Sequence, residues 1–286
     1  MKIEEIQPQL YQTFQKLVKN DHLSHAYVFV GGFGNYDLAV WLAKAVFCQE
    51  IVEGVPCGRC RICRLIDANE FSELQIIEPD GQTIKVEQIR ELLASFASTG
   101  FESTKKVVII KDAEKMGQNA ANALLKTIEE PDSEVYIFLL TENENLLLPT
   151  IQSRTQKVIF PKNTQYLSEF LQKKGLLKTD ADLLAAITDS TDKAQYLAES
   201  SWYLPASKAL ANFVQTAITS AEIAFLKVIE LLPHFEGKAE QEVAFDVLLV
   251  LFNQLGATNL TEKTFKAEKM WRANVRFGSC LESICL

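Results

Sequence analysis

The sequence predicts an α/β protein whose first part contains a parallel sheet and whose last part is entirely helical. Two observations predict this fold class: strand-like and helix-like segments alternate up to about residue 162, and no strand pattern recurs after it. The 286 residues, 48% of them hydrophobic, suffice for two or three domains with substantial cores. We therefore expect an α/β domain over 1–161, a small helical domain over 162–200 and a longer helical bundle over 201–286.

The predicted strands are short and rich in Val, Ile and aromatic side chains, as buried parallel strands are. They are AYVFVGG (26–32), KVVIIKDAEK (106–115) and EVYIFLLTEN (134–143), and KVIFPKN (157–163) carries the last strand signal. Between the strands we expect helices at LAVWLAKAVF (38–47) and NAANALLKTIEEP (119–131), the second stopped by Pro131. The later part predicts helices at 164–174 and 180–199, separated by Gly175, and then longer amphipathic helices broken at Pro233, Gly237 and Gly256.

Charge and hydropathy argue against a protein that binds DNA strongly by itself and against a membrane or secreted protein. The net charge is −8, with 37 acidic against 29 basic side chains, so strong DNA binding by the chain alone is not expected and a partner would have to supply most contacts. No apolar run approaches the roughly 20 residues of a membrane span, and the polar, acidic N-terminus is unlike a secretory signal. These features predict a cytoplasmic protein that does not contact a membrane.

Four of the six cysteines lie close together in the sequence and predict a structural zinc site. They are Cys48, Cys57, Cys60 and Cys63. Paired Cys-x-x-Cys turns can place four thiolates around one tetrahedral zinc ion, and four protein ligands leave no open position for catalysis. An iron–sulfur cluster fits less well because the spacing differs and no Cys-Pro follows, and buried reduced cysteines without metal are the plain alternative. Cys280 and Cys285 are expected to be incidental.

The segment after the first strand has the context of a phosphate-binding loop but not its chemistry. Against the pattern G-x-x-x-x-G-K-[ST], Gly31 and Gly34 remain as loop glycines, whereas Tyr36, Asp37 and Leu38 occupy the Gly, Lys and Ser/Thr positions. Tyr36 blocks close backbone approach, Asp37 would repel phosphate, and Leu38 has no oxygen for Mg²⁺. We expect no ATP at this loop, and taken alone the glycines are better explained by an ordinary strand-to-helix turn.

The second predicted strand lacks the acidic pair that such nucleotide-hydrolysing proteins carry. It ends at Asp112, and Ala113 occupies the position of the expected Glu. The machinery for metal binding and water activation is therefore incomplete at this strand as well.

Taken together, the cysteine cluster, the altered phosphate loop, NALLKTIEEP from Asn122 and IQSRT from Ile151 resemble the δ′ subunits of the bacterial DNA polymerase III clamp loader. The resemblance covers roughly residues 10–200. It implies an AAA+ fold, with a RecA-like α/β domain carrying the zinc insert (1–161), a helical lid (162–200) and a helical collar used for oligomerisation (201–286).

The resemblance also implies partners and one functional residue. In that family δ′ assembles with δ and the ATP-hydrolysing γ/τ subunits into a hetero-pentamer that loads the β sliding clamp onto primed DNA. The δ′ subunit does not hydrolyse ATP but contributes an arginine to its neighbour's site from a Ser-Arg-Cys motif. Here that motif corresponds to Ser153-Arg154-Thr155, with Thr155 in place of Cys. Arg154 is thus the predicted functional residue, although alone it would read as a surface arginine in a salt bridge.

Three other functions remain open from the residues alone. An active AAA+ ATPase would need the loop to bind nucleotide despite Asp37 and Leu38. A zinc-ribbon redox or metal-trafficking protein would need accessible, exchangeable thiols. A zinc-containing DNA-binding module could use the arginines next to the cysteines, which are Arg59, Arg61 and Arg64.

Overall fold

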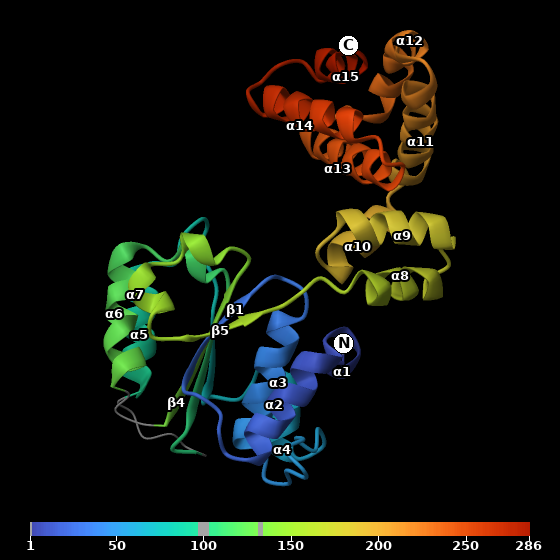
Figure 1. Cartoon of the computed structure of the whole chain (residues 1–286). Coiled ribbons are helices and arrows are strands. Elements are labelled where there is room, and N and C mark those ends of the chain that lie inside the picture. The colour runs from blue at the N-terminus through green and yellow to red at the C-terminus, as the bar shows by residue number, and fades with distance from the viewer. Residues whose placement is uncertain (1, 97–102, 131–133) are drawn as a thin grey trace. The chain divides into compact units, whose positions relative to one another are not determined.

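The computed structural model describes residues 2–96, 103–130 and 134–286, and the chain divides into two compact units (Figure 1). The units are Met1–Asn163 and Thr164–Leu286. The boundary falls two residues after the one predicted at 161/162. The further division into a lid (162–200) and a collar (201–286) stays a prediction, because Thr164–Leu286 forms a single compact unit.

The first unit is built around a five-stranded parallel sheet, which confirms the predicted fold class. Its strands are β1 (Ala26–Val30), β2 (Leu74–Ile77), β3 (Lys106–Ile110), β4 (Val135–Thr141) and β5 (Gln156–Ile159). The strand order is β2-β3-β4-β1-β5, and every neighbouring pair is parallel. Because β1 lies between β4 and β5, the loops that leave these three strands meet at one edge of the sheet.

Helices cover both faces of this sheet (Figure 1). One face carries α2 (Pro8–Lys19), α3 (Asn35–Phe47) and α4 (Arg61–Asp67), and the other carries α5 (Val86–Phe96), α6 (Gln118–Glu129) and α7 (Pro149–Gln152). The side chains of β1 alternate between the two cores: Tyr27 and Phe29 pack on the α3 side, and Ala26 and Val28 on the α6 side. Both faces are therefore buried, which explains the continuous apolar strand sequences.

Several elements of the first unit were not predicted, the short helices α4 and α7 among them. The others are α1 (Ile3–Ile6), α2, β2, α5 and the 3₁₀ turns η1 (Ala113–Lys115) and η2 (Glu144–Leu146). The strand β2 has four residues, of which three are only half-buried, so its apolar signal is weak. The predicted strand 106–115 ends at Ile110 because the chain turns at Asp112, whose φ is +47°. The proposed stop at Pro131 lies outside the described residues.

The second unit contains helices and no strand among its residues. They are α8 (Thr164–Lys173), α9 (Lys178–Ile187), α10 (Thr191–Glu199), α11 (Tyr203–Thr219), α12 (Ala221–Leu231), η3 (Leu232–His234), α13 (Lys238–Gln254), α14 (Thr258–Arg272) and α15 (Phe277–Cys285). The prediction of one helix over 180–199 is wrong. The chain leaves the helix at Thr188, and the Ser190 hydroxyl accepts the backbone N–H of Lys193 at 3.3 Å to begin α10.

The last helix explains the two remaining cysteines. Cys280 is fully buried in α15, and Cys285 is 7% exposed. Burial raises the pKa of both thiols, so they act as small apolar core residues. In the parts of the chain that the structure describes, no helix is both long enough and apolar enough to cross a bilayer.

Candidate functional site

The loop between β1 and α3 needs its glycines for packing. Gly31 has φ +104°, its N–H donates to the carbonyl of Thr141 at 2.8 Å, and a Cβ there would lie 2.6 Å from the carbonyl oxygen of Phe160. Gly34 has φ +85°, and a Cβ would meet Ile6 Cγ2 at 2.9 Å. Backbone conformation and close packing account for both glycines without a bound phosphate.

The three altered loop residues lie in different surroundings. Leu38 is fully buried in the core on the α3 side of the sheet. The ring of Tyr36 lies under the Lys111 ammonium, 4.2 Å from the ring centroid, and Lys111 also pairs with Glu78 at 2.6 Å. Asp37 lines a surface cavity of about 440 Å³ beside α3. Of these three side chains, Leu38 offers no oxygen to Mg²⁺, and Asp37 carries a negative charge where a phosphate-binding loop carries a cation.

The backbone N–H groups of the loop are also largely used within the chain. The N–H of Gly34 donates to Gly32, that of Leu38 to Gly34, and that of Tyr36 to the side chain of Asn35, at 3.1, 3.0 and 2.6 Å. A phosphate loop instead directs such groups at its anion. The turn therefore has no free backbone donor at Gly34, Tyr36 or Leu38.

The N-terminal segment is tied to this loop through a residue that sequence reasoning missed. Gln7 is 5% exposed, and its side-chain amide donates to the carbonyls of Phe33 at 2.9 Å and Pro161 at 2.6 Å. Both acceptors are backbone groups far away in sequence, so no local pattern indicates the contact. Gln7 holds the loop after β1 against the segment after β5.

At the end of β3, Asp112 and Ala113 occupy the two positions at which nucleotide-hydrolysing proteins carry an acidic pair. Asp112 pairs with Lys115 at 2.9 Å, and Ala113 is buried in the core on the α6 side. Asp112 therefore stabilises the turn at η1 through its ion pair with Lys115.

The four predicted zinc ligands come together beside α3 and α4. Cys48 ends α3, Cys57 lies in the connection, and Cys60 and Cys63 belong to the start of α4. Their sulfur atoms all lie within 4.8 Å of one another. Tetrahedral zinc with bonds of about 2.3 Å sets its sulfurs roughly 3.8 Å apart, so a small contraction would close the site. The donor set and its geometry fit a structural zinc ion.

The pKa values of thiols in the cluster are shifted in different directions. The backbone N–H of Arg59 lowers the pKa of Cys57 to about 7, whereas burial raises the pKa of Cys48 and of Cys63. Zinc binds thiolates, so an incoming ion has to displace protons from the thiols of Cys48 and Cys63.

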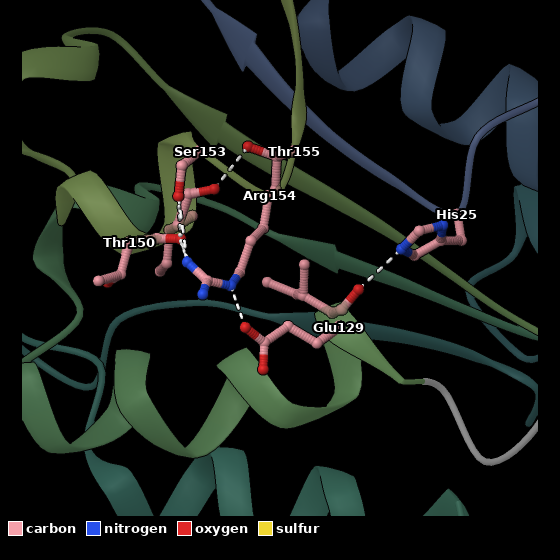
Figure 2. Close-up of polar contacts among 8 residues, drawn as sticks. His25, Glu129, Thr150, Ser153, Arg154 and Thr155 are labelled. Carbon is pink, nitrogen blue, oxygen red and sulfur yellow. Dashed lines mark hydrogen bonds and ion pairs between the residues drawn. The ribbon is translucent and has the colours of Figure 1, made fainter.

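Arg154 follows α7 and is held at several points by its own subunit (Figure 2). Its Nε donates to the carboxylate of Glu129, and its Nη1 donates to the carbonyl of Thr150 and the hydroxyl of Ser153, each at 3.1 Å. Among the described residues, Nη2 donates no hydrogen bond. The arginine side chain is 39% exposed. A guanidinium that is oriented, exposed and only partly bonded can still receive an anionic ligand.

Two neighbouring contacts complete this region (Figure 2). The hydroxyl of Thr155, at the motif position usually held by Cys, donates to the carbonyl of Ile151 at 2.9 Å. Nε2 of His25 lies 2.7 Å from the carbonyl oxygen of Ile128, at the end of α6. Sequence reasoning assigned no role to Glu129 or His25, although Glu129 lies within the quoted NALLKTIEEP segment.

The parallel sheet with β1 at its switch point, the phosphate-loop turn and the helical second unit define an AAA+ protein. The family described as DNA polymerase III, delta subunit, matches residues 6–164. The chain is 34% identical to DNA polymerase III subunit delta′ of Bacillus subtilis over 257 residues, which is 88% of this chain and 78% of the relative. It therefore belongs to the delta-prime family of DNA polymerase III subunits.

The chain is also similar to two further proteins. The chain is 32% identical to DNA polymerase III subunit delta′ of Escherichia coli over 188 residues, a match that spans 63% of this chain and 56% of that relative. A solved DNA polymerase III gamma-subunit-related protein from Thermotoga maritima aligns over 96% of both chains at 19% identity, with a TM-score of 0.49.

Proposed function

We propose that this chain is the non-hydrolysing subunit of a DNA polymerase III clamp loader and that it supplies Arg154 to the ATP site of a neighbouring subunit. The observation that carries the proposal is the contrast between two sites. The chain's own loop presents Tyr36, Asp37 and Leu38 where phosphate chemistry needs Gly, Lys and Ser/Thr. Arg154 meanwhile offers an exposed, partly unbonded guanidinium.

The chemistry of Arg154 suits a role in trans. A guanidinium is permanently charged and presents a rigid fork of donors, so it can stabilise negative charge that develops on a transferring γ-phosphoryl group. Ser153 contributes by fixing Nη1 through its hydroxyl. No step of ATP hydrolysis is assigned to this chain's own loop.

The proposed partners are the γ/τ and δ subunits in a hetero-pentamer, which reaches the β sliding clamp and primer-template DNA as a complex in the cytoplasm. An apolar surface on the second unit supports assembly. Along α12, Leu226 and Ile229 are 72% and 73% exposed, and Ile223 and Phe225 are exposed beside them. Contiguous exposed apolar side chains of this kind are typical of protein interfaces. The acidic net charge agrees with DNA contacts made mainly by partners.

We also propose that Cys48, Cys57, Cys60 and Cys63 bind one structural zinc ion. Four thiols within 4.8 Å of one another support this assignment. With all four ligands supplied by protein, the ion would hold the segment between α3 and α4 in place and supply no catalysis.

The alternatives make different demands. An active ATPase would require nucleotide binding at a loop whose Leu38 is buried and whose N–H groups at Gly34, Tyr36 and Leu38 are already bonded. A redox or DNA-binding zinc ribbon would not need the ordered surroundings of Arg154.

The deciding experiment replaces Arg154 in a reconstituted complex. We expect Arg154→Ala to fold, retain zinc and assemble, and to lower both the DNA- and clamp-stimulated ATPase and the clamp-loading rate. Arginine fingers contribute on the order of 10³ to 10⁵ in rate at one site, and other intact sites would make the total loss smaller. Arg154→Lys should be almost as impaired, because a point charge does not reproduce the guanidinium fork. Unchanged rates in a properly assembled Arg154→Ala complex would refute the proposal.

A further inference from the structure

The orientation of Arg154 depends on a residue of a different element. Glu129 is the last residue of α6, 25 positions away in sequence, and its carboxylate accepts the Nε–H of Arg154 (Figure 2). The other two contacts of the guanidinium, to Thr150 and Ser153, come from its own turn and both bind Nη1. Glu129 is thus the only partner of Nε among the described residues.

Glu129 is itself rigidly supported. The buried face of α6 packs on the sheet through Ala120, Ala121, Leu124 and Ile128. The carbonyl of Ile128, in the final turn, is bound by Nε2 of His25, and the His25 carbonyl accepts the N–H of Ile137 in β4. A helix's last carbonyls have no partner within the helix, so this side-chain contact fixes the end of α6. The sheet therefore sets the position of the Glu129 backbone, from which the carboxylate reaches Arg154.

We propose that Glu129 is a positioning residue for Arg154, which holds the guanidinium so that Nη2 is presented to a neighbouring subunit's nucleotide. This inference rests on the proposed role of Arg154 in trans. An arginine side chain loses rotamer entropy when it is ordered, and a site that fixes it beforehand avoids that loss when the guanidinium engages the charge that develops on the transferring phosphoryl group. Nε is used for positioning, and Nη2 is kept for the phosphate.

The role is distinct from catalysis because Glu129 does not contact the nucleotide. Its loss should leave nucleotide affinity at the neighbouring site unchanged and lower the turnover there. The quantity to measure is the Arg154-dependent turnover. For each complex it is the stimulated kcat of that complex minus the stimulated kcat of the Arg154→Ala complex.

The experiment compares three variants in the reconstituted complex. We expect Glu129→Ala to lose more than half of the Arg154-dependent turnover, with the KM for ATP unchanged. Glu129→Gln keeps an oxygen that accepts from Nε, so it should retain more than Glu129→Ala. The matched control is Glu130→Ala, which removes the adjacent exposed carboxylate. Among the described residues, Glu130 forms no ion pair. The Glu130→Ala complex should therefore behave as the wild type does.

The outcomes separate this inference from the proposed function. If Arg154→Ala has no effect, the proposed function fails. If Arg154→Ala lowers turnover but Glu129→Ala leaves the Arg154-dependent part unchanged or increases it, only the positioning role fails. An increase would instead mean that Glu129 restrains the arginine.

A second measurement needs neither partners nor nucleotide. In the isolated full-length chain, the Nε–H of Arg154 should exchange more slowly with solvent than that of an unpaired arginine when followed by ¹⁵N NMR. Glu129→Ala should accelerate this exchange at least severalfold, whereas Glu130→Ala should not. Equal exchange in both variants would overturn the positioning role.

Discussion

At the scale of single residues, Cys60 has two separable tasks. Its sulfur accepts the backbone N–H of Cys63 at 3.5 Å as the N-cap of α4, and it is one of the four clustered thiols. Serine is also an effective N-cap but a poor ligand for zinc. The replacement Cys60→Ser therefore tests metal binding with little change to the cap.

We expect the wild-type protein, purified without added metal, to contain one zinc ion per chain and Cys60→Ser to contain much less. The variant should also melt at a lower temperature, because binding of a structural metal contributes to folding. Elemental analysis gives the metal content, and Cys285→Ala, which changes a cysteine outside the cluster, should retain full zinc. Substoichiometric zinc in the wild type, together with four readily alkylated cysteines, would exclude the zinc site.

At the scale of an element, α13 carries an acidic residue in an unfavourable environment. Burial raises the pKa of Asp246 to about 6; Glu242 and Glu268 add to this effect, and Lys193 and Arg272 oppose it. In the unfolded chain the same carboxyl titrates near 3.8. Below about pH 4 the carboxyl is mostly protonated in both states, so it has little effect on the free energy of unfolding. Between about pH 4 and 6 the unfolded carboxyl is ionised while the folded one keeps its proton, so stability falls as the pH rises; above pH 6 the folded state also carries the unfavourable charge, and the loss is complete.

Asp246→Asn should therefore stabilise the second unit at pH 7.5, by on the order of 1–3 kcal/mol. The gain should shrink below pH 6 and vanish near pH 4. Thermal unfolding of variant and wild type across this range provides the test, with Glu262→Gln as the matched change of an exposed carboxylate. A gain that does not vary with pH would show that titration of Asp246 is not its cause.

At the scale of the whole molecule, the altered loop predicts that the isolated chain binds no nucleotide. Leu38 is buried, Asp37 adds a negative charge, and the loop donors at Gly34, Tyr36 and Leu38 are bonded within the chain. Calorimetry with millimolar ATP and Mg²⁺ should show no binding, and the chain should show no ATPase activity above background. Saturable binding with a micromolar dissociation constant would contradict this.

The sequence predicted the features that depend on local patterns. The central strands are continuous apolar runs, and the cysteine cluster has metal-binding spacing. Each substitution in the loop can be identified by comparing its position with the phosphate-loop pattern. It could not predict contacts between distant segments. Gln7 reaches Phe33 and Pro161, and Glu129 reaches Arg154, only because the sheet order brings their elements together. The break before Ser190 was missed because its flanking sequences both favour helix.

The strand order also has a consequence for synthesis on the ribosome. Both neighbours of β1 come late in the chain: β4 begins at Val135 and β5 at Gln156, the latter roughly 125 residues after β1 ends. At about 5 to 20 residues per second, the emerging AYVFV segment waits roughly 6 to 25 seconds for its second partner. During that interval an apolar strand with two unpaired edges is exposed to other nascent chains. The early helices α2 and α3, which cover one of its faces, are complete long before then, so their docking onto β1 is the protection available while translation continues.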